Sequence, residues 1–188
     1  TFTYTCTDGT EGTLKAKADG AAAQAGATFP QGTTCTVKED IESARLDGYT
    51  LTAPAEQTVT VKDPTESIAT AAFTNSYTRD TGAFSIAKSV QGGPQGAANG
   101  SYSFTYTCDG GVQGTLTVPG DGTAVSSPQI PTGVSCALAE DTAAAAKSGY
   151  SVASSLSQDT VTITKDQTVA VTAANTYTRD MGTFSVTK

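Results

Sequence analysis

Lys88 stands at a position where the surrounding pattern calls for an apolar residue. In residues 82–88, strand alternation puts Phe84, Ile86 and Lys88 on the same face. A bare ammonium group is costly to bury, and a lysine kept from water gives up its proton more readily than an exposed one. An amine without its proton is a nucleophile. Lys88 is therefore a candidate reactant.

A carboxyl group and a carboxamide break the alternation in the same way. Glu140 shares a predicted strand face with Leu138, and Asn175 lies between two apolar positions of another face. Glu39 and Asn75 repeat both anomalies in the first part of the chain. One buried polar residue is ordinary, but recurrence at matched positions calls for a common explanation.

Two less reactive interpretations are open. Lys88 and Glu140 could form a buried salt bridge, with Asn175 capping a loop, because buried ion pairs occur as devices of structural specificity. Lys88 could also lie at a strand end and extend its ammonium group to water. The adjacent carboxylates, Asp141 and Asp40, point to the opposite strand face and are expected to be solvated.

The composition argues against several classes of function. The 188 residues include 18 acidic and 11 basic side chains, and the net charge of -7 argues against nucleic acid and anionic membranes as partners. The sequence has no histidine, which removes the commonest metal ligand and the commonest general base near neutral pH. It also has no long apolar span, phosphate loop or nucleophile motif. We expect no cofactor, no metal, no membrane insertion and no enzymatic activity.

Four cysteines form two equivalent pairs. Cys6 and Cys35 are 29 residues apart, Cys108 and Cys136 are 28 residues apart, and no C-x-x-C motif is present. This spacing fits neither zinc binding nor redox chemistry, and both pairs lie on inward strand faces. We predict two disulfides, one in each half of the chain, formed in an oxidising compartment.

An internal repeat sets the architecture. The segment FTYTC at residues 2–6 returns at residues 104–108, and NSYTRD at 75–80 returns as NTYTRD at 175–180. Two units of about a hundred residues therefore stand in tandem. Short alternating runs rich in Thr, Val and Tyr, separated by Gly, Asp and Pro turns, predict an all-β fold. With an inward cysteine pair in each unit, the prediction is two tandem Ig-like β-sandwich domains.

The repeat also suggests domain boundaries. We expect residues 82–178 to form a complete domain and residues 1–78 to form a domain that lacks its first strand. Residues 182–188, GTFSVTK, repeat residues 82–88, GAFSIAK, and are expected to be the first strand of a following repeat.

The polar residues sit in a pattern that resembles a known family. A strand ending in lysine, a glutamate about ten residues before Gly149-Tyr150, and an Asn-Thr-Tyr near the end of the unit resemble the CnaB-like domains of Gram-positive surface proteins and pilins. Tandem cysteine-bearing versions in actinobacterial surface proteins are the most similar. The resemblance covers essentially the whole chain. It departs from the family at Ser148, where a proline usually precedes Gly-Tyr.

The resemblance implies a covalent cross-link. In that family a lysine and an asparagine join in an intramolecular isopeptide bond, helped by a glutamate. By position, Lys88 would bond to Asn175 with Glu140 assisting, and Glu39 would be the equivalent catalytic residue of the first unit. A neutral amine can attack the side-chain carbonyl while a protonated glutamate donates to its oxygen and passes a proton to the departing ammonia.

Two pairings are open for the other reactive groups. In the first, Glu39 and Asn75 await an upstream lysine, or Lys188 on a strand donated by a neighbouring molecule, which would give a strand-complemented, cross-linked homopolymer. In the second, Lys88 folds back onto Asn75, 13 residues away, and Lys188 serves Asn175.

The function expected from these features is mechanical. We expect a stalk repeat of an adhesin or pilus-like fibre, located outside the cell on the wall of a Gram-positive bacterium, with neighbouring repeats of the same protein as partners. The alternative is a ligand-binding adhesin module that contacts a host or cell-surface partner through loops such as residues 91–101.

Overall fold

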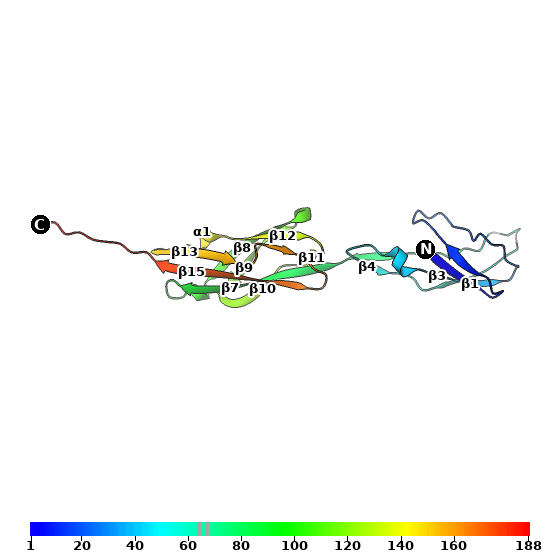
Figure 1. Cartoon of the computed structure of the whole chain (residues 1–188), viewed down its shortest axis with the longest axis horizontal. Coiled ribbons are helices and arrows are strands. Elements are labelled where there is room, and N and C mark those ends of the chain that lie inside the picture. Colours follow the sequence, from blue (N-terminus) through cyan, green and yellow to red (C-terminus); the bar gives the residue numbers. More distant parts are fainter. Residues whose placement is uncertain (64, 67) are drawn as a thin grey trace. The chain divides into compact units, whose positions relative to one another are not determined.

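Short alternating runs of Thr, Val, Tyr and Ala fold as strands along most of the chain, and tight glycine turns join them. The computed structural model describes residues 1–63, 65–66 and 68–188. It divides into two units, Thr1–Arg79 and Asp80–Lys188, which are described separately (Figure 1). No helix in these ranges is long and apolar enough to cross a membrane.

One sheet of the second unit contains the strand on which Lys88 lies. The strand order is β10-β7-β15-β13, with β11 beside β7. Strands β7 and β15 run parallel, and the other pairs are antiparallel. The strands are β7 (Thr81–Gly92), β10 (Asp121–Ser126), β11 (Ile130–Pro131), β13 (Tyr150–Leu156) and β15 (Thr168–Arg179).

The other sheet of the second unit packs against the first and is antiparallel throughout. Its order is β14-β12-β8-β9. The strands are β8 (Ser101–Cys108), β9 (Gln113–Pro119), β12 (Ser135–Glu140) and β14 (Thr160–Thr162). Both sheets contribute to one buried core, which contains Phe84, Ile86, Phe104 and Val118 (Figure 1). The predicted β-sandwich is therefore confirmed.

Short turns of helix connect these strands. They are η2 (Ala97–Asn99), η3 (Asp109–Gly111) and α1 (Thr142–Ala145). The α1 turn begins where the Asp141 side chain accepts a hydrogen bond from the Ala144 amide, an N-cap that explains why the alanine-rich segment starts there. The cap leaves Asp141 exposed, as alternation predicted.

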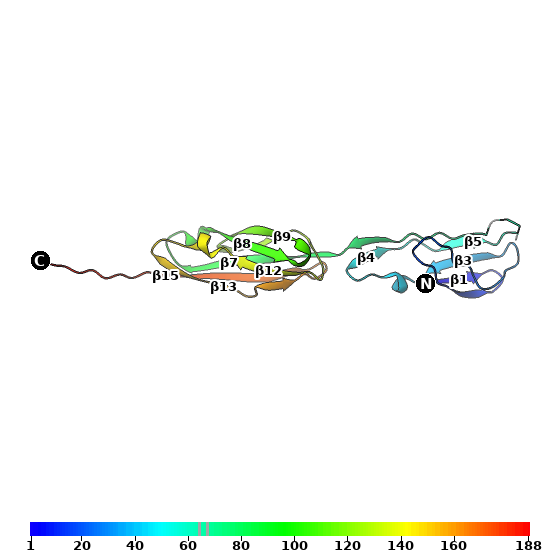
Figure 2. The ribbon, with the colours of Figure 1, turned by 90° about the horizontal axis from the view of Figure 1, so that it is seen from above.

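The first unit contains a smaller version of this fold. Its main sheet has the order β2-β1-β3-β5, and a separate pair, β4-β6, stands beside the turn η1 (Figure 2). The elements are β1 (Phe2–Cys6), β2 (Glu11–Leu14), β3 (Thr34–Glu39), η1 (Ile41–Ala44), β4 (Tyr49–Thr52), β5 (Gln57–Thr60) and β6 (Ser76–Arg79). Among the described residues, the buried members of its apolar core are Tyr4, Cys6, Cys35 and Val37.

Residues 68–75 of the first unit differ from their counterparts in the second. Their equivalents, residues 168–175, form most of β15, whereas 68–75 have no strand structure. The reason is a missing partner, because the backbone groups of a strand need a ladder on which to pair. In the second unit β7 supplies that ladder along β15.

Both predicted disulfides are present, and each joins neighbouring strands of one sheet. Cys6 bonds to Cys35 across β1 and β3, and Cys108 bonds to Cys136 across β8 and β12. The members of each pair lie directly opposite one another in the strand register. The disulfides therefore fix strand register within a sheet and do not join the two layers of a sandwich.

Removal of a disulfide should affect the first unit more than the second. Closing a loop of 28 or 29 residues stabilises a fold by about 3–4 kcal/mol through the unfolded state. Since the first unit has the smaller core, the variant Cys6→Ala/Cys35→Ala should lose the melting transition of that unit in calorimetry. The matched variant Cys108→Ala/Cys136→Ala should keep both transitions, with the second one lowered. Equal shifts in the two variants would contradict this assignment.

Candidate functional site

Lys88 lies inside the second sandwich. Along β7 the buried residues alternate, so that Phe84, Ile86 and Lys88 face the core. The exposed fraction of Lys88 is 0%, and that of Asn175 on the neighbouring strand β15 is also 0%. In the parallel register Lys88 lies beside Ala173, and Asn175 lies beside Val90. The interpretation in which Lys88 extends its ammonium group to water is therefore wrong.

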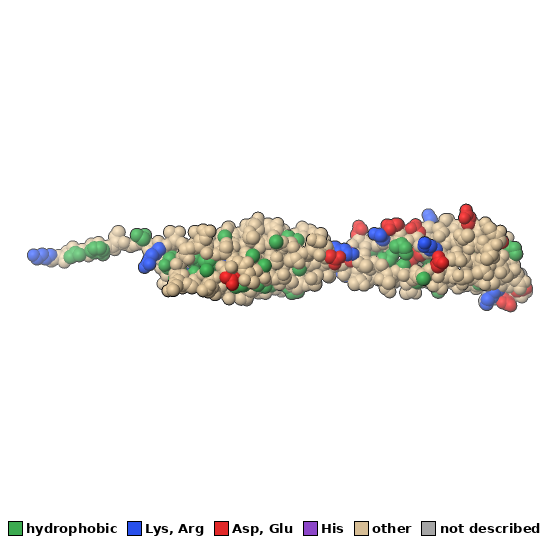
Figure 3. Space-filling model, turned by 90° about the horizontal axis from the view of Figure 1, so that it is seen from below, with side chains coloured by type: hydrophobic (Ala, Val, Ile, Leu, Met, Phe, Trp, Pro, Cys, Tyr) green, Lys and Arg blue, Asp and Glu red, His purple; other side chains and the backbone are tan. Residues whose placement is uncertain are grey.

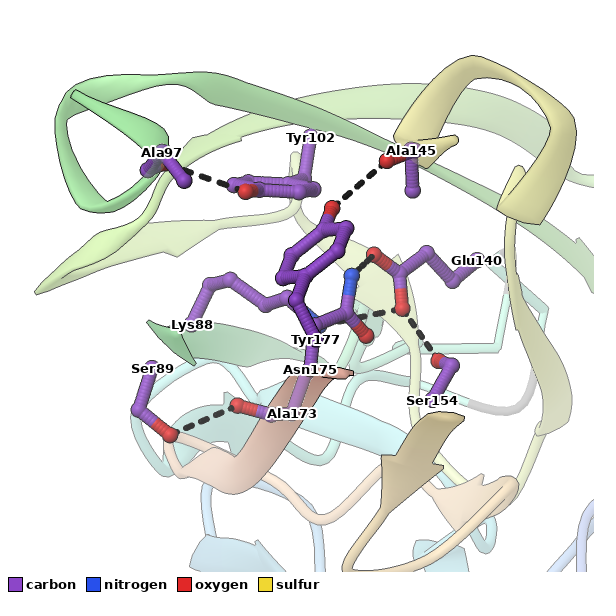
Figure 4. A network of polar contacts seen from close by, with 10 residues as sticks. All are labelled: Lys88, Ser89, Ala97, Tyr102, Glu140, Ala145, Ser154, Ala173, Asn175 and Tyr177. Atoms are coloured by element: carbon purple, nitrogen blue, oxygen red, sulfur yellow. Dashed lines mark hydrogen bonds and ion pairs between the residues drawn. The ribbon is translucent and has the colours of Figure 1, made fainter. Parts of the chain in front are cut away.

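Glu140 reaches this pair from the opposite sheet. It is the last residue of β12, and its side chain is 2% exposed. Lys88 Nζ donates to Glu140 Oε2 at 3.0 Å, and Asn175 Nδ2 donates to Glu140 Oε1 at 2.8 Å (Figure 4). One carboxylate therefore holds the amine with one oxygen and the carboxamide with the other.

Ser154 is a member of the site that sequence reasoning missed. It lies on β13 directly opposite Asn175, and its hydroxyl group donates to Glu140 Oε2 (Figure 4). A signal was available, because Ser154 falls on the same strand face as Val152 and Leu156. With Ser154 and Lys88 both donating to Oε2, the carboxylate is fixed in one orientation.

Aromatic rings and a loop cover the amine. The rings of Tyr102 and Phe104 lie 5.2 and 5.7 Å from Lys88 Nζ, a distance at which a ring face attracts a cation. The Tyr102 hydroxyl group donates to the Ala97 carbonyl at 3.0 Å, and this bond ties the loop around η2 to the site. Tyr177 donates to the Ala145 carbonyl at 2.5 Å and ties down α1. Together these contacts keep water from the amine.

Burial shifts the titration of these groups. Desolvation lowers the pKa of Lys88 from its ordinary value of 10.5, although the hydrogen bond and the charge of Glu140 act in the opposite direction. The pKa of Tyr102 is raised, first by burial and then by its contact with Tyr177. The lysine is thus poised to lose its proton, while the tyrosine keeps its own.

The carboxamide of Asn175 is held at one end only. Its Nδ2 donates to Glu140, whereas its buried Oδ1 has no hydrogen-bond partner among the described residues. A buried acceptor without a donor is costly. Asn175 Oδ1 is therefore free to accept a hydrogen bond from a further donor.

An open surface pocket has Glu140 among its lining residues. It has a volume of about 540 Å³ and is lined by Glu140, Thr142, Ser154 and residues 155–159. It opens beside the carboxylate, on the side formed by β13 and α1. A small molecule released at Glu140 would have a way out.

The first unit contains half of the same arrangement. Asn75 Nδ2 donates to Glu39 Oε1 at 2.9 Å, and Tyr77 donates to the Ala44 carbonyl as Tyr177 does to Ala145. The groups that would contact the other carboxylate oxygen are missing. No lysine among the described residues contacts Glu39 Oε2, and Ala53 stands at the position of Ser154, one residue beyond the β4-β6 register.

The consequence in the first unit is a pair of unsatisfied atoms. Glu39 Oε2 and Asn75 Oδ1 are buried and have no hydrogen-bond partner within the described part of the chain. The remaining predicted residue, Lys188, lies exposed in the C-terminal segment. The structure thus brings Lys88, Glu140 and Asn175 together, pairs Glu39 with Asn75, and leaves Lys188 apart from both groups.

Comparisons with solved structures find surface proteins. An adhesin from Mobiluncus mulieris, described as containing intramolecular disulfide, isopeptide and ester bond cross-links, is 18% identical with a TM-score of 0.43, over 78% of this chain and 58% of that chain. The major pilin of Streptococcus pyogenes is 14% identical with a TM-score of 0.38, over 93% of this chain and 90% of that chain. This chain therefore spans little more than half the length of the adhesin. No curated protein matches.

A family match covers nearly the whole chain and repeats along it. Residues 1–78 and residues 84–178 each match the family described as "Domain of unknown function (DUF5979)". The chain therefore belongs to the DUF5979 family and contains two tandem copies of its domain.

Proposed function

We propose that this chain is a stalk repeat of an adhesin or pilus-like fibre on the outer surface of a Gram-positive bacterium. In this proposal an isopeptide bond between Lys88 and Asn175 fastens the second unit. The observation that supports it best is the shared carboxylate: a fully buried amine and a fully buried carboxamide each bind one oxygen of Glu140.

The first step is a proton transfer. Two charges in a site closed to water are costly to maintain, and burial lowers the pKa of Lys88. The proton therefore moves from Nζ to Oε2 along the 3.0 Å hydrogen bond. The products are a neutral amine, which is a nucleophile, and a carboxylic acid, which is a hydrogen-bond donor.

The second step forms the new bond. The lone pair of Nζ attacks Cγ of Asn175, and a rotation of the carboxamide presents Oδ1 to the acid of Glu140, which stabilises the developing oxyanion. The bond from Cγ to Nδ2 then breaks. Glu140 passes one of the amine protons to the departing nitrogen and keeps the other, so that amine and carboxamide become a secondary amide and ammonia. The pocket beside Glu140 gives ammonia a route to solvent.

Positioning supplies what an external catalyst would otherwise provide. A primary amide is a poor electrophile, but reactants held in contact behave as if at effective molarities of up to about 10⁵–10⁸ M. The strand pairing of β7 with β15 and the shared carboxylate hold the reactants here. The reaction turns over once and is a maturation step of the protein itself.

The bond would change how the unit transmits tension. Strands β7 and β15 are the first and last of the unit and run parallel, so that a pull on Thr81 and Arg179 shears them past one another. A covalent link from Lys88 to Asn175 passes that load directly between the two strands. Residues 89–174, which include most of the core, then lie outside the path of the force.

The bond should be visible in the mass of the intact protein. Loss of ammonia removes about 17 Da, and each disulfide removes about 2 Da. The variants Lys88→Met and Glu140→Gln should lose the larger deficit and keep the smaller ones, while the control Lys15→Met, at an exposed lysine, should keep all of them. A wild-type mass without the larger deficit would refute the bond.

The bond should also stabilise the second unit. In the double variant Lys88→Met/Glu140→Gln no charge is left buried without a partner. The expected loss of unfolding free energy is about 4–5 kcal/mol, the value for opening a closed loop of roughly this length. Calorimetry should show a lower melting temperature for the second unit and an unchanged melting temperature for the first unit. An unchanged melting temperature of the second unit would speak against a covalent link.

Without the bond, stability should depend on alkaline pH. The variant Asn175→Ala keeps the amine, whose pKa is lowered from 10.5 by burial. Between the lowered and the ordinary pKa the unfolded chain binds more protons than the folded one, so unfolding free energy rises with pH. It should level off above about 10.5. Urea unfolding across this range should show the rise in Asn175→Ala but not in Lys88→Met/Asn175→Ala, and equal pH profiles would contradict it.

A further inference from the structure

Ser154 connects the buried site with the surface of the second unit. Lys88 and Asn175 are 0% exposed and the side chain of Glu140 is 2% exposed, whereas Ser154 is an exposed residue. Its hydroxyl group nevertheless points inward and donates to Glu140 Oε2 (Figure 4). Ser154 and Glu140 also line the same surface pocket.

The need to satisfy a polar group does not explain this contact. Uncharged polar side chains and backbone atoms cover most of the second unit in the view of Figure 3, so an exposed serine is ordinary on this surface. The hydroxyl group of such a residue can bond to water with little effect on stability. The feature that sets Ser154 apart is its bond to a buried carboxylate.

Strand pairing brings the hydroxyl group next to the carboxamide. Ser154 lies directly opposite Asn175 in the antiparallel register of β13 and β15. The Cβ atoms of such a pair are about 4.5–5.5 Å apart. Seven successive residue pairs hold this register. The pairing that presents the carboxamide to Glu140 therefore also presents the hydroxyl group.

The carboxylate of Glu140 gains from a third contact. The last torsion of a glutamate is broad, so the group turns readily about its terminal bond. Lys88 bonds to Oε2 and Asn175 bonds to Oε1, but both of these partners move in the proposed reaction, because the amine attacks and the carboxamide rotates. Ser154 is the one of the three partners that takes no part in bond formation.

A hydroxyl group also suits both protonation states of Glu140. It can donate to a carboxylate and accept from a carboxylic acid, whereas the amide nitrogen of Asn175 can only donate. In the proposed reaction Glu140 begins as a carboxylate, becomes an acid and keeps one amine proton at the end. By turning its O–H bond, Ser154 can stay bonded to Oε2 in each of these states.

We propose that Ser154 is a positioning residue for the bond between Lys88 and Asn175. Its hydroxyl group holds Glu140 Oε2 toward the amine while Oε1 stays on the carboxamide, and it forms no bond to either reactant. The proposal rests on the proposed function and adds a group on which the rate of that reaction depends. A misplacement of about 1 Å can slow a reaction about a hundredfold. Without the hydroxyl group the bond still forms, but slowly.

Four variants of the full chain separate the hydroxyl group from the space that it fills. Ser154→Thr keeps the hydroxyl group, Ser154→Val has the shape of threonine without it, and Ser154→Ala removes it. The control Ser126→Ala removes an exposed serine hydroxyl group from β10, at the other end of the strand order. Each chain is synthesised in an oxidising cell-free translation reaction and quenched in acid at successive times. The fraction of intact chains that has lost about 17 Da then gives the rate.

The hydroxyl group should change the rate and not the product. We expect Ser154→Thr and Ser126→Ala to react as fast as the wild-type chain, and Ser154→Val and Ser154→Ala to react about ten to a hundred times more slowly. All of them should reach the same final loss of mass. The reacted Ser154→Ala chain should melt at nearly the wild-type temperature, because water replaces the exposed hydroxyl group. A purely structural role would instead lower that temperature and leave the rate unchanged.

The result that overturns this inference differs from the one that overturns the proposed function. Equal rates for Ser154→Thr and Ser154→Val would show that the hydroxyl group does not matter, and would leave the bond between Lys88 and Asn175 in place. A wild-type chain that never loses the 17 Da would refute the bond, and the role of Ser154 with it.

Discussion

A single, almost fully buried carboxylate links the two sheets of the second sandwich. Glu140 stands on one sheet and receives an amine from β7, an amide from β15 and a hydroxyl group from β13, which are three strands of the other sheet. Desolvating such charges is costly, so the site needs complete cover, which Tyr102 and the loop it holds provide. The same cost favours transfer of the proton from lysine to glutamate, the step that the proposed chemistry requires.

The two units show what one strand contributes. Both keep the glutamate, the asparagine and the tyrosine that ties down the neighbouring turn. Where β7 is present, its partner is a strand of twelve residues and the core is large. Where no such strand pairs, residues 68–75 have no strand structure, and the core of the described residues has four buried members. Lys88 therefore lies on the strand that completes the second unit, and the pairing of β7 with β15 also positions its amine.

Alternation in the sequence was sufficient to predict the strand faces, the disulfides and the sandwich. It placed Lys88 on the inward face, because the face of a residue can be assigned without knowing which strand pairs with its own. It could not predict that β7 runs parallel to β15, since alternation assigns side chains to faces but does not identify the neighbouring strand. Ser154 was missed because a lone serine on a strand face is common. The lack of structure at residues 68–75 depends on a pairing partner, which the local sequence does not encode.

The cost of burying the ion pair is itself an argument for a reaction. A buried lysine and glutamate are weak stabilisers, because an apolar pair of similar volume often serves as well or better. An ion pair also gives no reason for an asparagine on the second carboxylate oxygen, or for its unsatisfied Oδ1. The proposed amide formation would account for these features. It would replace the charged amine with a neutral amide, release ammonia and leave the remaining amine proton on Glu140, so that no charge stays buried at the site.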